Sequence, residues 1–159
     1  MPSLRLLAGL ALSLAWSACV TPPPPAERAS DAARQLNVAS RFGELASVID
    51  MTSPRIRERF QARRSAWGKD VRVVDVELAS LDLSDAHHAK VVVDFSWTRT
   101  NEGTLRATRV MQEWEAAEGP WLLVREKRVS GDLGLFGERV AMQESAPRPD
   151  VQFPTRVIR

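Results

Sequence analysis

Apolar residues recur with a helical period in the part of the chain that follows its proline-rich segment. Between residues 26 and 49 they fall at intervals of three or four positions, which is the spacing of one face of an α-helix. The pattern therefore predicts an amphipathic helix over 26–49, with an inward face made of Val38, Phe42, Leu45 and Ile49.

A second helix is predicted after a short break. Ser53 can cap the first turn with its hydroxyl group, Pro54 suits the first helical position, and Gly68 ends the pattern after Trp67. The side chains expected to face inward are Ile56, Phe60 and Trp67.

After Gly68 the hydrophobic period changes to two, which is typical of β-strands. The alternation slips near Ala79, which predicts a β-bulge. The connections are too short for parallel crossovers, so consecutive strands should pair antiparallel. We therefore expect an α+β domain, with an N-terminal helical hairpin packed on a four-stranded antiparallel meander of strands 71–83, 91–98, 104–115 and 121–129.

The order of these elements, and the segments Glu113-Trp114-Glu115 and Gly119-Pro120-Trp121-Leu-Leu-Val124, resemble the end of the nuclear-transport-factor-2-like fold. The resemblance covers roughly residues 28–130. It implies a curved sheet that wraps the N-terminal helices as a cone. Members of that family usually have a third short helix before the sheet, which this sequence does not predict.

The N-terminus has the three parts of an export signal: a basic start, an apolar stretch over 6–16, and the small residues Ser17 and Ala18 before Cys19. The apolar stretch is shorter than the roughly 20 residues that a membrane-spanning helix needs. The position of Cys19 resembles the lipobox of bacterial lipoprotein precursors, although Trp16 stands where that family usually has leucine. The resemblance implies a signal peptide at 1–18, lipidation of Cys19 and attachment to a membrane.

The chain contains one cysteine, so no disulfide within the chain explains Cys19. An ordinary secretory signal with a chance cysteine is the alternative. We expect a proline-rich tether at 19–27, a single domain at 28–140 and a flexible, proline-containing tail at 141–159. Because Val20 rather than aspartate follows the cysteine, the resemblance points to the outer membrane, facing the periplasm.

The formal net charge is only +2, which argues against a nucleic-acid partner. The densest positive region is the predicted second helix, where three arginines recur every four residues. They form either a solvated helix face or a contact for anionic lipid or an anionic envelope polymer: Arg55, Arg59 and Arg63.

No residue pattern predicts a metal or cofactor site. His87 and His88 are adjacent and would point apart on a strand, so a solvated turn is the simpler interpretation. The glycines at 131, 134 and 137 lack the Gly-Lys-Ser/Thr ending of a phosphate-binding loop.

Two segments could contact a protein partner. In the glycine-containing loop, three apolar residues either pack back on the domain or form an exposed patch: Leu133, Leu135 and Phe136. The tail could pair in extended form with an exposed sheet edge of a partner, or could be a dispensable terminus; its apolar residues include Phe153, Val157 and Ile158.

We therefore expect a lipid-anchored cell-envelope protein that acts as a non-catalytic interaction or scaffold module with an unidentified envelope partner. The alternative is a small-molecule-binding cone domain, such as an isomerase or lyase. Asp75 and Glu113 distinguish the two hypotheses, because an enzyme of that kind would hold one of them in an apolar cavity of at least about 300 Å³.

Overall fold

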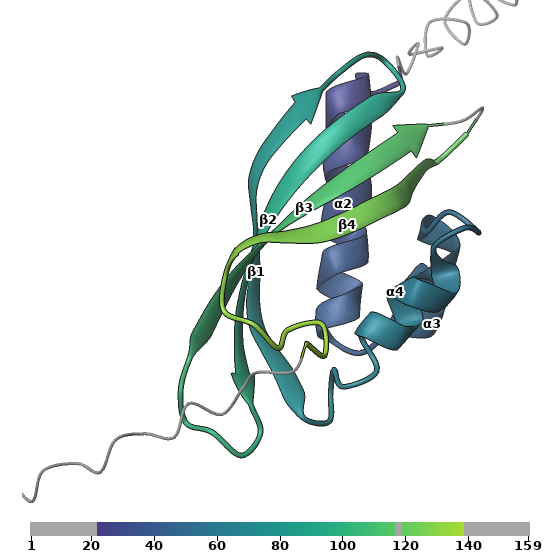
Figure 1. Ribbon diagram of the computed structural model, residues 1–159. Coiled ribbons are helices and arrows are strands. Elements are labelled where there is room, and N and C mark those ends of the chain that lie inside the picture. Colours follow the sequence, from purple (N-terminus) through teal and green to yellow (C-terminus); the bar gives the residue numbers. More distant parts are fainter. Residues whose placement is uncertain (1–21, 117–118, 139–159) are drawn as a thin grey trace, which may run out of the picture.

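The helices precede the sheet in this computed structural model, which describes residues 22–116 and 119–138 (Figure 1). The fold is α+β, as the sequence predicts. The predicted signal peptide at 1–18, Cys19 and the predicted tail at 141–159 lie outside the described residues.

The first helix, α2 (Pro25–Arg41), carries proline in its first turn and begins within the segment that we assigned to the tether. The predicted inward face is wrong for two of its four residues, because Val38 is 41% and Phe42 69% exposed. Leu45 and Ile49 are partly buried and pack against the core, as predicted. The face that packs on the sheet instead consists mainly of small residues: Ala29, Ala33, Leu36, Asn37 and Ser40. Small side chains allow the helix to lie close to the sheet.

The predicted helix over 26–49 is two helices. Gly43, with φ at +80°, reverses the chain after α2, in a conformation that suits glycine. The short α3 (Leu45–Val48) and a 3₁₀ turn, η1 (Ile49–Met51), follow. The described chain therefore has a third short helix before the sheet, which the sequence pattern did not predict.

The helix α4 (Arg57–Arg63) is shorter than predicted and does not begin at Ser53, so it carries Arg59 and Arg63 but not Arg55. The backbone N–H of Ser53 instead donates to the carbonyl oxygen of Leu123, at 2.8 Å. A strand-like contact between Thr52 and Leu123 thus uses the residues that the sequence assigned to the helix cap.

The sheet is an open antiparallel meander in the order β1-β2-β3-β4. This confirms the predicted strands and their pairing. The strands are β1 (Val71–Leu83), β2 (His88–Arg99), β3 (Arg106–Ala116) and β4 (Trp121–Gly131). Figure 1 shows α2 lying along one face of the twisted sheet, with α3 and α4 beyond its β4 side.

Two bulges keep the apolar side of β1 on the core. The register shifts between Val73 and Asp75 and again between Leu78 and Ser80, the second at the predicted position. After each shift, the apolar residues of β1 again lie on the same face of the sheet as the buried residues of β2 with which they pair. The residues of β1 on this face are Val71, Val73, Val76, Leu78, Leu81 and Leu83.

The interior is filled by large side chains. Trp97 and Trp114 are at most 1% exposed, and Trp67 and Trp121 at most 6%, which confirms the inward position predicted for Trp67. The indole N–H of Trp97 donates to the Thr108 hydroxyl oxygen at 2.9 Å.

A buried amide pair fixes α2 on the sheet. Asn37 and Gln112 each donate an N–H to the side-chain carbonyl oxygen of the other, both at 2.9 Å. Asn37 also donates to the backbone carbonyl oxygen of Ala33 at 2.7 Å. Because both side chains are buried, a shifted docking of α2 would leave amide groups unpaired.

In the part of the chain that the structure describes, no helix combines the length and apolar character needed to cross a membrane.

Candidate functional site

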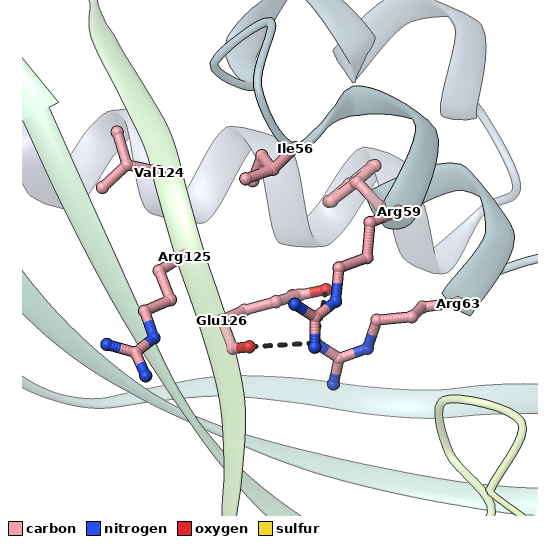
Figure 2. Close-up of a pocket in the computed structure, with 7 residues that line it drawn as sticks. Ile56, Arg59, Arg63, Val124, Arg125 and Glu126 are labelled. Carbon is pink, nitrogen blue, oxygen red and sulfur yellow. Dashed lines mark hydrogen bonds and ion pairs between the residues drawn. The ribbon is translucent and has the colours of Figure 1, made fainter.

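A hollow of about 200 Å³ lies between α4 and β4 (Figure 2). Its apolar lining comes from Ile56 and Phe60 on the α4 side and Val124 on β4. Figure 2 shows Arg59 and Arg63 reaching from α4 toward Glu126, whereas Arg125 extends to the other side of β4. Guanidinium groups beside an apolar surface suit an amphipathic anion.

Directly under this hollow, Arg64 and Glu126 form a buried ion pair. Two guanidinium nitrogens of Arg64 donate to the two carboxylate oxygens of Glu126, at 2.5 and 2.7 Å. The side chains are 0% and 4% exposed, respectively. The guanidinium carbon of Arg64 also lies 3.8 Å from the ring centroid of Phe60. Glu126 is thereby neutralised by a bidentate contact.

The two partners reach the interior for different reasons. Arg64 follows Phe60 by four positions and precedes Trp67 by three, so helical periodicity places it on the inward side. Glu126 turns inward because β4 shifts register between its pairs with Glu113 and Trp114. Simple alternation from Trp121 and Leu123 would have turned residue 125 inward. Neither residue was predicted from the sequence. The spacing of Arg64 from Phe60 and Trp67 could have indicated its inward position, whereas no local pattern indicates that of Glu126.

Arg63 stabilises the same interface. It donates to the backbone carbonyl oxygen of Glu126 at 2.9 Å, and its guanidinium carbon lies 3.9 Å from the ring centroid of Phe136. Burial lowers the pKa of the Arg63 guanidinium, Glu126 raises it, and the positive charges of Arg64 and Arg59 lower it further. Its side chain is only 19% exposed.

The three arginines proposed as one anionic contact therefore have different environments. Arg55 and Arg59 are exposed, and neither forms an ion pair within the described part of the chain. Arg63 is a packing residue of the α4–β4 interface. Only Arg55 and Arg59 remain available to an external anion.

The glycine-containing loop packs back on the domain, which is the first of the two alternatives considered for it, so it does not form the exposed apolar patch of the second. Leu135 is 0% and Phe136 6% exposed. The indole N–H of Trp67 donates to the carbonyl oxygen of Leu135 at 2.7 Å, and the Trp67 and Phe136 rings stack at 6.2 Å. The Glu138 carboxylate accepts backbone N–H groups of Gly134 and Phe136. Only Leu133, at 40% exposure, stays accessible.

The carboxylates considered as catalytic groups lie outside the core. The Asp75 side chain is 66% exposed and pairs with Arg41 at 3.2 Å. Glu113 is 30% exposed and lies 3.8 Å from Arg125. Glu113 lines an open hollow of about 530 Å³, whose wall also carries the charged side chains of Arg55, Glu115 and Arg125. Neither Asp75 nor Glu113 is therefore the buried carboxylate in an apolar cavity that we expected for an isomerase or lyase.

The histidines lie at the turn between β1 and β2 with separate partners. A ring nitrogen of His87 lies 3.1 Å from the carbonyl oxygen of Ala116, and one of His88 lies 2.8 Å from the Asp85 carboxylate. Within residues 22–116 and 119–138, no three metal-ligating side chains come together. Cys19, Phe153, Val157 and Ile158 fall outside these ranges.

Comparison with known proteins supports the fold alone. No family model matches the chain, and no curated protein matches it. Among solved structures, the chain is similar to a SEC-C motif containing protein from Rhodopseudomonas palustris, determined in solution, with a TM-score of 0.54 and 15% sequence identity. The match covers 62% of this chain and 77% of that one. At this identity the similarity concerns the arrangement of helices and strands.

Proposed function

We propose that this chain is a lipid-anchored, non-catalytic interaction module of the bacterial cell envelope. The proposal rests on the burial and the ion-pair partners of three carboxylates. Glu126, the buried one, is neutralised by Arg64, while Asp75 and Glu113 lie outside the core. A general acid or base needs a group whose proton is free to move near a bound substrate. The export signal before Cys19 supplies the anchor.

The binding surface in this proposal is the outer side of the hollow between α4 and β4. Arg59 is exposed at the hollow itself, and Arg55 is exposed just before α4. Clustered arginines beside apolar side chains attract anionic lipid or an anionic envelope polymer. We place the protein at the outer membrane, facing the periplasm, with residues 19–24 as the tether.

The similarity to the nuclear-transport-factor-2-like fold belongs to the same proposal. A curved sheet with α2 along one face supports it, and so does the short α3 before the sheet. The sheet is open rather than closed, and large side chains occupy its concave side. A cone-like shape would therefore support surface contacts rather than an internal ligand.

Metabolic labelling with a clickable fatty acid, in a host that processes lipoproteins, tests the anchor. The wild-type chain should incorporate label and sediment with membranes, and Cys19→Ala should do neither. A Ser17→Ala variant is a matched control, because it changes the signal without removing the thiol. Equal labelling of wild type and Cys19→Ala, or no labelling of either, would refute the anchor.

A further inference from the structure

The two edge strands of the sheet, β1 and β4, differ in the hydrogen bonds that they make outside the sheet. The edge of β4 is covered, because two of its carbonyl oxygens accept hydrogen bonds from outside the sheet. The Ser53 N–H donates to Leu123, and the Arg63 guanidinium donates to Glu126. On β1 only the first residue, Val71, makes backbone hydrogen bonds on its outer side, to Ala66 and Gly68. From residue 72 to 83, β1 has no backbone partner other than β2 within the described chain. Such an edge can accept another strand.

The apolar side of β1 is also incompletely covered. The β2 residues opposite it, such as Val91, Val93 and Phe95, are at most 1% exposed. The β1 residues on the same face remain partly exposed, and an added strand would cover their free flank. These residues are Val76, Leu78, Leu81 and Leu83.

A hollow of about 570 Å³ adjoins the start of this edge. It includes Phe42, which is 69% exposed, and Val74, which is 40% exposed. Arg41 and Arg72 also line it. An exposed aromatic ring next to a free strand edge offers a place for an apolar side chain of an added strand.

We propose that the edge of β1 over residues 73–83 binds the C-terminal segment 150–159 of this chain as an added β-strand. The segment alternates Val151 and Phe153, and Pro154, which lacks an N–H, suits only an edge strand. Because β1 already lies at the sheet margin, the added segment becomes the new edge.

Charge favours this occupant over a second copy of β1. The strand contains Asp75, Glu77 and Asp82 against one arginine, so two copies side by side would repel each other. Residues 150–159 contain two arginines against one aspartate. The two β1 bulges would also disturb pairing between two copies of this strand.

The connection is long enough for the segment to reach the edge. Glu138 is two residues from Phe136, which stacks on Trp67, and Trp67 is bridged to Val71 at the start of β1. Residues 139–149 can span roughly 36–40 Å when extended. This is close to the length of β1, about 43 Å for its 13 residues.

Hydrogen–deuterium exchange tests the docking with the mature chain, residues 19–159, against a chain that ends at Ser145. With the tail present, peptides from residues 73–83 should exchange about tenfold more slowly, and residues 150–158 should be protected. If dilution leaves the protection unchanged, the segment binds its own copy; if dilution removes it, the segment binds a neighbouring copy. Both results support the proposed occupant.

Four variants make the test specific. Phe153→Asp in the tail and Phe42→Ser beside the edge should abolish the protection. Gln152→Ser and Leu105→Ser should keep it, since neither changes a charge and the 63% exposed Leu105 directly precedes β3, which β2 separates from β1 in the sheet. Equal exchange of residues 73–83 with and without the tail would overturn the proposal. A dimer that persists in the chain ending at Ser145 would assign the edge to a second copy instead.

Discussion

Arg64 and Glu126 show how a charged pair can occupy the interior of this small domain. Each carboxylate oxygen accepts one guanidinium hydrogen bond, and the guanidinium also lies against the ring of Phe60. The pair joins α4 to β4 at the place where β4 would otherwise be a free edge. Removing one partner would leave the other as an uncompensated buried charge.

We expect Arg64→Ala to lower the free energy of unfolding by about 3–5 kcal/mol, because Glu126 then stays buried without its partner. Urea denaturation measures this loss. The double variant Arg64→Met with Glu126→Leu should recover most of the stability, because no charge is left unpaired. Arg59→Ala is the control on the same helix and should change stability by less than about 0.5 kcal/mol. If Arg64→Ala behaved like Arg59→Ala, the pair would not be structural.

Substitution of Arg59 should affect vesicle binding alone, whereas substitution of Arg63 should lower the free energy of unfolding. An exposed arginine near an anionic bilayer contributes about 1 kcal/mol, so Arg59→Ala should weaken binding to vesicles that contain phosphatidylglycerol about fivefold. Its unfolding free energy should be unchanged. Arg63→Ala should instead destabilise the domain, since it removes the hydrogen bond to Glu126 and the contact with Phe136. Co-sedimentation with anionic and neutral vesicles measures the binding. Unchanged binding of Arg59→Ala would remove this surface from the proposal.

Among single residues, inward positions could be predicted only where the period was unbroken. Phe95 and Trp97 lie in a strand whose alternation is unbroken, and both are buried. Phe42 was assigned to the core by a helical stripe that continues past Gly43, where the real helix has already ended. The spacing of apolar residues in a sequence can continue beyond a turn, although the helix itself has ended there.

At the scale of elements, the strands were predicted more closely than the helices. Strand ends are marked by polar turns such as 100–105, and all four strands lie within a few residues of their predicted ranges. The start of α4 is decided by a long-range contact between Ser53 and Leu123, which no local pattern contains. Tertiary pairing therefore overrode a good local capping sequence at this position.

Gly131, at the end of β4, is needed for close approach of two strands. Its φ is +86°, and a Cβ atom there would overlap the carbonyl oxygen of Ala107. We expect Gly131→Ala to cost more than about 2 kcal/mol of stability, through both conformational strain and overlap. Gly137→Ala is the matched control: its φ is +76° and nothing obstructs a Cβ, so about 1 kcal/mol is expected. Equal losses in thermal unfolding would show that the overlap is relieved cheaply.

The exposed face of the sheet carries a cross-strand pair that gives a pH dependence. Hydrogen bonding from Arg109 lowers the pKa of Asp94. The ionised carboxylate thus stabilises the native state above the unfolded pKa of about 3.9, and this contribution is lost as the pH falls through the native pKa. Asp94→Asn should therefore lose less stability than wild type between about pH 5 and pH 2. Arg109→Gln should have the same effect. Parallel stability curves for Asp94→Asn and wild type, from urea unfolding at each pH, would contradict the assignment.

At the scale of the whole molecule, the β4 edge of the sheet is covered by other parts of the described chain and the β1 edge is not. The α4 side is closed by the Arg64–Glu126 pair, the packed loop 132–138 and the Thr52–Leu123 contact. The β1 side offers a free edge beside Phe42. The described part of the domain therefore has one covered and one uncovered sheet edge. The order of elements could be predicted from sequence, but this asymmetry depends on contacts between distant residues.

The mass of the mature N-terminus shows whether the chain is lipid-anchored. The protein should be purified from membranes of a host that processes lipoproteins and measured intact and as its N-terminal peptide. We expect the mature chain to begin at Cys19 and to carry a diacylglyceryl group on the thiol and an acyl group on the amine. A mature chain with an unmodified thiol at Cys19, or one that still begins at Met1, would refute the lipid anchor.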